Sequence, residues 1–254
     1  MSDKNLPNEI ADYLIAKIYV GDLKPGQKLP SERNLSELLG VNRTSLRMAL
    51  RQLDRMRLIE SRPRSGILIR DFRASAGMDF IDAVLRNPDI EQGAAILLES
   101  TTLWVEYIPR VFFEANLSSG SGMLLELHSI VEEQMAEAAG AANLQTLTEL
   151  EMRMQDVLVS NQSSILIATL MNSVRSMIQA VIYQSFATVD PTTHVSVNKR
   201  YIEQALAGQR GNVEFIEQYR DHLRNFTQPL RDKISDWPMQ PKLKTTRFVD
   251  IKDV

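Results

Sequence analysis

Within the first seventy positions, the spacing of apolar residues changes from the period of a helix to a strand-like pattern. Apolar residues about 3.6 positions apart predict a helix over 6–20, a short helix over 32–39 and a third over 43–55. The strand-like Ile67-Leu68-Ile69 and the tip Arg62-Pro63-Arg64-Ser65-Gly66 before it then predict two short strands, at 59–62 and 66–69. The predicted order is therefore one supporting helix, two helices joined by a tight turn, and a two-stranded hairpin.

Three residues set the ends of the two later helices. Ser31 precedes the first of them, where its hydroxyl can accept a hydrogen bond from a backbone N–H in the first turn. Gly40 follows that helix, because glycine enters the left-handed conformation without steric cost. Asn42 is placed to cap the next helix. The turn between the two helices is therefore predicted to be only a few residues long.

The helix over 43–55 is predicted to have two distinct faces. Its buried stripe has the spacing i, i+3, i+4 and i+7: Leu46, Ala49, Leu50 and Leu53. Beside it runs a ridge of arginines four residues apart: Arg43, Arg47, Arg51 and Arg55. Arginine can bind phosphate or the guanine edge, so such a helix suits the DNA major groove. Four arginines alone also fit a solvated helix face, but the neighbouring turn and hairpin favour DNA binding.

A series of short motifs runs in one order from residue 23 to the hairpin. They are Leu23-Lys24-Pro25-Gly26, Lys28-Leu29-Pro30-Ser31-Glu32-Arg33, Leu35-Ser36-Glu37, Gly40-Val41-Asn42-Arg43-Thr44-Ser45-Leu46-Arg47 and Gly66. In order and spacing, the segment from about 6 to 70 resembles the winged helix-turn-helix domain of the GntR family of bacterial transcription regulators. We expect Arg33, Arg43 and Arg47 to carry most of the DNA contact. Thr44, Ser45 and Gly66 are expected to assist, since the two hydroxyls can bind phosphate.

The expected DNA contacts differ in kind. Arg43 and Arg47 are assigned to base edges and Arg33 to phosphate. In the family the tip of the hairpin, the wing, lies against the minor groove, and the resemblance places Gly66 there. This chain departs from the family pattern at Pro63, which stiffens the wing tip and removes a backbone donor.

Charge is divided unequally along the chain. Residues 1–75 hold 14 Lys and Arg against 9 Asp and Glu, a net charge of +5, whereas the rest holds 15 against 23, a net charge of −8. A basic first part on an acidic body is typical of a polyanion-binding head. The absence of cysteine excludes disulfides, thiolate metal sites and cysteine nucleophiles. With no long apolar run and no leader-like opening, we expect a cytoplasmic protein without a membrane partner.

The remainder of the chain is predicted to be helical. We expect a winged helix-turn-helix domain over 1–70, a linker over 71–77, an all-helical effector-binding and dimerisation domain over 78–237, and a loosely ordered tail over 238–254. Pro109 is expected to kink or split a helix that starts at Ile90. Later helices are predicted at 124–139, 144–159, 165–186, 195–207 and 213–234. The fold class is therefore mainly α, with a C-terminal antiparallel helical bundle.

The helical body resembles that of the FadR subfamily of GntR regulators, which binds an effector and dimerises. Many members hold a metal there with an Asp, a His four residues later and two further His. The matching positions here are Glu151, Gln155, Lys199 and His222. An amide is a poor zinc or nickel ligand and an ammonium repels a cation, so we predict a degenerate site without a metal cofactor.

The same region is still expected to bind a small-molecule effector. Subfamily members that bind acyl-CoA also lack the metal ligands, and an acyl chain would need an apolar tunnel. Candidate tunnel residues, which fit an ordinary core equally well, are Met152, Met154, Leu158, Met171, Met177 and Ile178. A small carboxylate is the other candidate, with Lys199, Arg175 or Arg153 as its anchor. His128 and His194 share no spacing with these positions and are not assigned to the site.

The sequence therefore predicts a homodimeric transcription regulator that binds a palindromic operator in double-stranded DNA and responds to an effector. An enzyme is disfavoured, because there is no Gly-rich phosphate loop, nucleophile elbow, metal-ligand pair or acid–base cluster. The alternative is a helical scaffold or adaptor whose winged head binds protein. Salt dependence separates these functions, because DNA binding releases counterions and weakens steeply with salt.

Overall fold

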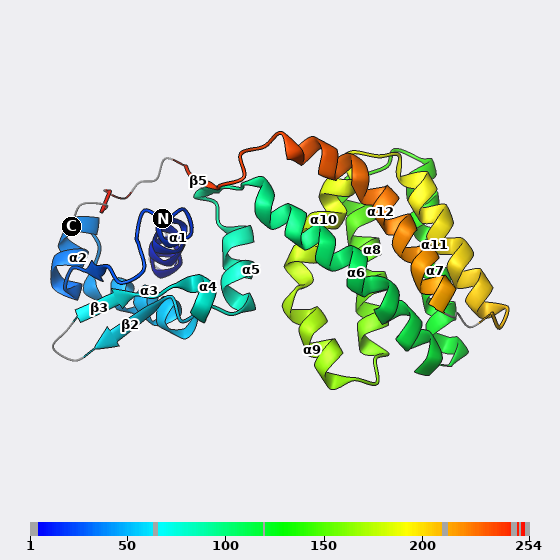
Figure 1. Ribbon diagram of the computed structural model, residues 1–254, viewed down its shortest axis with the longest axis horizontal. Helices are drawn as coiled ribbons and strands as arrows, with labels where there is room; N and C mark the ends of the chain where they lie inside the picture. Colours follow the sequence, from blue (N-terminus) through cyan, green and yellow to red (C-terminus); the bar gives the residue numbers. More distant parts are fainter. Residues whose placement is uncertain are drawn as a thin grey trace. The chain divides into compact units, whose positions relative to one another are not determined.

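The computed structural model describes residues 5–62, 66–118, 120–209, 213–244, 248 and 250–251. This part of the chain contains twelve helices and five short strands (Figure 1). It divides into two compact units: residues 1–93 together with 238–254, called the head, and residues 94–237, called the bundle. The boundary between the units therefore falls after Gly93 and not in the expected linker over 71–77.

The head is built on three helices and a three-stranded antiparallel sheet of order β1-β3-β2. In the hairpin, Ile59 pairs with Ile69 and Arg62 with Gly66. The helix-turn-helix and the two strands of the wing have the predicted order (Figure 1). The elements span Leu6–Tyr19 (α1), Lys28–Leu29 (β1), Glu32–Leu39 (α2), Arg43–Arg55 (α3), Ile59–Arg62 (β2) and Gly66–Ile69 (β3).

The helix ends expected around the turn are confirmed by their hydrogen bonds. The Ser31 hydroxyl accepts from the backbone N–H of Asn34 at 3.3 Å, and the Asn42 side chain accepts from that of Ser45 at 2.8 Å. Gly40 ends α2 with a φ of 64°, in the left-handed region. These contacts satisfy donors that a helix leaves unpaired, and they fix the angle at which α3 follows α2.

The head core extends past the expected linker. Within that stretch lies α4 (Phe72–Ser75), followed by α5 (Met78–Arg86). The ring centroids of Phe72 and Phe80 are 5.1 Å apart, and each is 6.1 Å from Tyr19 on α1. Aromatic packing therefore ties both helices to the head.

A two-stranded sheet was missed by sequence reasoning. Ile90–Glu91 (β4) pairs antiparallel with Lys242–Leu243 (β5). Both strands lie within the head, although about 150 residues separate them. Two-residue strands are too short to show an alternating pattern, which explains why only helices were predicted here.

The described residues of the bundle form seven helices, and α7 packs on both α8 and α11. Pro109 lies inside the continuous helix α6, so the predicted split is absent there, whereas the helix expected over 165–186 breaks into α9 and α10 with a 58° bend. The elements span Ala94–Ser118 (α6), Ser121–Ala139 (α7), Leu144–Ser160 (α8), Ile165–Ser173 (α9), Arg175–Phe186 (α10), Pro191–Leu206 (α11) and Val213–Ser235 (α12).

In the described part of the chain, no single helix combines the length and the apolar composition needed to cross a bilayer. The bent pair α9–α10 reaches that composition when its two helices are taken together.

Candidate DNA-binding surface and effector site

The amphipathic pattern of α3 determines which residues can meet DNA. Leu46, Ala49 and Leu53 are fully buried, and α1 packs against this helix. Arg43 and Arg47 lie on its exposed face. The fold therefore presents the arginine ridge to solvent as the predicted recognition surface.

Two of the candidate arginines are held by carboxylates. Arg47 donates two hydrogen bonds to Glu32 Oε2, at 2.8 and 3.2 Å, and so links α3 to α2. Arg33 pairs with Glu37 one turn along α2, with an N–O distance of 3.2 Å. All four side chains are at least 38% exposed, and such ion pairs contribute about 0–1 kcal/mol. A phosphate or a base edge can therefore replace either carboxylate.

The remaining DNA-binding candidates occupy different environments. Thr44 is exposed in the first turn of α3, whereas Ser45 is only 7% exposed and its backbone N–H is bound by Asn42. Burial corrects the expectation that the Ser45 hydroxyl points toward phosphate. Gly66 begins β3 with a φ of 89°, and Pro63 lies outside the described residues.

A buried polar cluster lies in the bundle, formed by residues of four helices. At its centre is Glu151 on α8, with 1% exposure. Its carboxylate accepts hydrogen bonds from Gln134 at 3.0 Å, Asn198 at 3.3 Å and Gln155 at 3.3 Å. The members of this polar cluster are Gln134, Glu151, Gln155, His194, Asn198, Tyr219 and His222.

Two imidazoles and a phenol complete the polar cluster. His194 Nδ1 lies 2.9 Å from His222 Nε2, and His194 Nε2 lies 3.6 Å from Glu151 Oε2. The Tyr219 hydroxyl donates to Asn198 Oδ1 at 2.9 Å. The cluster thus joins α7, α8, α11 and α12 through one hydrogen-bonded network.

Burial and neighbouring groups set the charges in the polar cluster. Burial alone would raise the pKa of Glu151, but contacts with His194, Gln134 and Gln155 outweigh it and lower the pKa below its ordinary value. Burial and the nearby His194 lower the pKa of His222 to about 3. The cluster therefore holds an ionised carboxylate beside a neutral His222 at neutral pH.

Of the predicted effector residues, the structure brings together Glu151, Gln155 and His222. Lys199 instead lies on the surface, 2.6 Å from Glu132, and Arg175 pairs with Asp156 at 2.8 Å. The positions on α11 that face the polar cluster are His194 and Asn198. Their burial at 1% and 2% corrects both the assignment of Lys199 and the omission of His194. Their i, i+4 spacing on a helix was the available signal.

The polar cluster does not fit the metal centre that the FadR resemblance implies. The amide nitrogens of Gln155 and Asn198 point at the Glu151 carboxylate, so hydrogens occupy the positions where a cation would bind. His194 and His222 face each other through a hydrogen bond. Transition metals prefer imidazole, thiolate and carboxylate donors with free lone pairs. The residues present form a hydrogen-bonded network instead.

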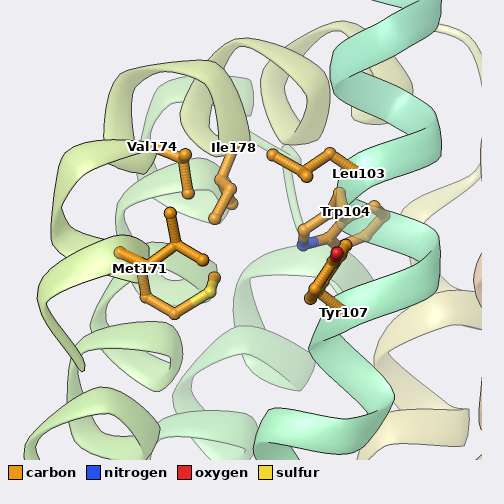
Figure 2. A pocket seen from close by; sticks show the side chains of 7 residues that line it. Leu103, Trp104, Tyr107, Met171, Val174 and Ile178 are labelled. Atoms are coloured by element: carbon orange, nitrogen blue, oxygen red, sulfur yellow. The ribbon is translucent and has the colours of Figure 1, made fainter. Parts of the chain in front are cut away.

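The apolar side of the bundle has a small hollow. Figure 2 shows Trp104 and Tyr107 of α6 facing Met171, Val174 and Ile178. Its volume of about 10 Å³ has room for about one water molecule. Of the six predicted tunnel residues, the hollow is lined by Met171 and Ile178, while Met152, Met154 and Leu158 are buried in the core. An acyl chain has no space there in this conformation.

The head matches a protein-family model described as "Bacterial regulatory proteins, gntR family" over residues 6–69. Residues 6–69 of the head are therefore a GntR-family helix-turn-helix domain. Among curated relatives, the HTH-type transcriptional regulator Mce2R of Mycobacterium tuberculosis is 38% identical over 35% of this chain and 37% of its own length. A fatty acid metabolism regulator protein of Vibrio cholerae is 30% identical over 45% of this chain and 42% of its own length. The chain thus spans less than half of these two relatives.

The fold of the chain was also compared with solved structures. Lar, described as controlling expression of the Listeria monocytogenes agr system, aligns over 92% of this chain and 99% of its own, with a TM-score of 0.52 and 17% identity. At that identity the likeness concerns the fold alone. The relatives are transcriptional regulators, not enzymes.

Proposed function

We propose that the protein is a transcription regulator that binds operator DNA through its GntR head. The observation that carries this proposal is α3, which is buried along one stripe and presents its arginine ridge to solvent. We place α3 in the major groove, with Arg43 and Arg47 at base edges, Arg33 and Thr44 at phosphate, and Gly66 of the wing near the minor groove. Binding chromosomal DNA implies action in the cytoplasm.

We infer further that the regulator acts as a homodimer on a palindromic operator. One recognition helix reads about one half-site, so a two-fold protein matches a two-fold DNA sequence. A second head also doubles the phosphate contacts, which steepens the dependence of affinity on salt. A scaffold whose head binds protein has no reason to show that dependence.

The test begins by selecting genomic DNA fragments with the full chain. Binding to the selected fragment is then measured by fluorescence anisotropy at several salt concentrations. We expect an inverted-repeat site and a log-log slope well below −1, because each phosphate contact contributes about −0.9. No enrichment of any fragment, together with a salt-independent protein partner, would support the scaffold instead.

Arginine variants separate base reading from phosphate binding. Arg47→Ala should cost about 1–3 kcal/mol and relax specificity at one base position. Arg33→Ala should weaken all sequences evenly. Arg110→Ala in the bundle is the matched control, because Arg33 and Arg110 are both 71% exposed and each pairs with a glutamate four residues on. If Arg47→Ala weakens every sequence equally, Arg47 does not read a base.

We also propose that the polar cluster is where a small-molecule effector acts on the bundle. The amides of Gln134 and Gln155 are oriented by Glu151, which leaves their side-chain oxygens without a hydrogen-bond donor among the described residues. A buried acceptor without a donor costs about 1–3 kcal/mol, so a ligand hydroxyl or ammonium there would be stabilised. An uncharged or cationic polar molecule suits this cluster better than either expected effector. An acyl-CoA would need an apolar tunnel, and a small carboxylate would approach the negative charge of Glu151.

The effector proposal can be tested without knowing the ligand. The full chain is analysed by native mass spectrometry for co-purified small molecules, and then by thermal shift against a set of sugars, amines and small carboxylates. Gln155→Leu should abolish the shift produced by a true ligand. Gln145→Leu, on the exposed face of the same helix, should preserve it, since its amide only bonds Glu149. Equal loss in both variants would place the ligand elsewhere.

A further inference from the structure

The stretch over 238–254, which was expected to be a loosely ordered tail, makes specific contacts with the N-terminal part of the head. Its described residues, 238–244, 248 and 250–251, are called the tail segment. Beyond the β4–β5 pairing, the backbone N–H of Lys244 donates to Asp89 O at 2.8 Å. Ile251 is only 1% exposed, and the ring of Phe248 lies 5.1 Å from that of Tyr13. These contacts attach the tail segment to α1 and β4.

The anchor of the tail segment is an ion pair with a buried lysine. Lys17 of α1 is 1% exposed and binds Asp22 at 2.8 Å and Asp250 at 2.6 Å. Burial would lower the pKa of Lys17, but the two carboxylates outweigh it and raise the pKa above its ordinary value. A buried ammonium is destabilising unless it is paired, so Asp250 stabilises the charged form of Lys17 on α1.

Gly93 makes room for the same segment. A Cβ atom at Gly93 would lie 2.5 Å from Met239 O and 2.8 Å from Gln240 C, both backbone atoms. Real Cβ atoms do not approach backbone this closely, so any side chain there would displace the tail segment. The absence of a side chain at Gly93 therefore lets the backbone of residues 239–241 lie directly against the chain between β4 and α6.

The tail segment also continues directly from the helix that carries part of the polar cluster. Tyr219 and His222 lie on α12, which runs as one helix to Ser235. The helix covers roughly 20 Å from His222 to its end, at 1.5 Å per residue. The chain therefore crosses between bundle and head twice, once after Gly93 and once after Trp237.

We propose that the face of α1 around Tyr13 and Lys17 is a docking surface for the tail segment, through which α12 controls the head. With the tail segment docked, α1 is held against α3 in the arrangement that binds DNA. A displacement of α12 at the polar cluster pulls on the tail segment and loosens α1. The DNA consequence rests on the proposed function, whereas the docking itself does not.

The docking is tested by hydrogen exchange on the full chain. The double variant Phe248→Ala/Asp250→Asn should speed exchange of the α1 amides by about five- to twentyfold, the range expected for losing an aromatic contact and an ion pair. The bundle amides should be unaffected. Gly93→Ala should reproduce the effect, and Met239→Ala should not, because that side chain is 53% exposed. Unchanged α1 exchange in the double variant overturns the proposal.

The proposed control of the head by α12 is tested by comparing one substitution in two backgrounds. Tyr219→Phe removes the hydrogen bond to Asn198 and should alter α1 exchange in the otherwise natural chain. In the Phe248→Ala/Asp250→Asn background the same change should have no effect on α1. An effect of equal size in both backgrounds, or in neither, overturns the control by α12. If exchange responds as expected but the natural chain selects no operator, the proposed function fails while the docking stands. If the chain binds its operator and the double variant binds it equally well, the control of DNA binding by the tail segment fails while the proposed function stands.

Discussion

Asp12 on α1 offers a stability prediction with a magnitude. Burial, and then the negative charges of Asp89 and Glu9, raise the pKa of Asp12 from 3.8 to about 6. The neighbouring Asn87 side chain donates to the Asp12 backbone carbonyl and not to its carboxylate. The ionised side chain is therefore disfavoured in the folded head.

The linkage between protonation and folding gives the sign and the size of the effect of pH on the stability of the head. Because the folded pKa lies above the unfolded one, stability is fully present below about pH 4 and is lost as the pH rises through 6. A shift of about two units corresponds to about 3 kcal/mol at 1.36 kcal/mol per unit, which is an upper value for a half-buried group. Asp12→Asn removes the charge, so, after a discount for solvent screening, it should stabilise the head by about 1–2 kcal/mol at pH 7.5 and by little near pH 4.

Native-state hydrogen exchange of the α1 amides measures this difference, because their protection reports the opening of the head. The exposed Asp54 on α3 provides the control substitution, Asp54→Asn. A gain from Asp12→Asn that is the same at both pH values would show that helix propensity, not charge, is responsible. No gain at pH 7.5 would refute the burial argument itself.

Three further substitutions test local features. Gly40→Ala keeps the turn free of clashes but forces a left-handed φ of 64° on alanine, so urea denaturation should show a loss of about 1 kcal/mol. Asn42→Ala removes the cap on the Ser45 N–H and should cost about 0.5–2 kcal/mol and weaken operator binding, whereas Asn42→Ser should restore both. Tyr219→Phe leaves Asn198 Oδ1 without that donor and should destabilise the bundle by about 1–3 kcal/mol, read by tryptophan fluorescence because Trp104 and Trp237 both belong to the bundle.

Local rules were sufficient for the helix-turn-helix. The ends of α2 and α3 depend on Ser31, Gly40 and Asn42, which act on backbone groups within three residues of themselves. The two wing strands were predicted at the residues where they lie, Ile59–Arg62 and Gly66–Ile69, because the strand-like stretch and the glycine at the tip fall within eleven consecutive residues. Where chemistry and position lie in one short stretch, a single sequence is informative.

The candidate effector site could be predicted only in part. Glu151 and His222 were found through a family spacing, but the same spacing selected Lys199 in place of its buried neighbour Asn198. A shift of one residue on a helix turns a side chain by about 100°, from core to solvent. His194 was missed because its partners, His222 and Glu151, come from other helices. Such a contact depends on how helices pack, which the pattern within one helix does not encode.

The tail segment has a consequence for the order of folding during synthesis. The bundle is encoded by one continuous stretch, so it can fold once residue 237 has left the ribosome. The head is discontinuous: Lys17 and β4 wait for Asp250 and β5, which are synthesised after the bundle. The head thus begins synthesis before the bundle and is completed after it. A chimera that exchanges heads between regulators must carry both pieces, residues 1–93 and the tail segment.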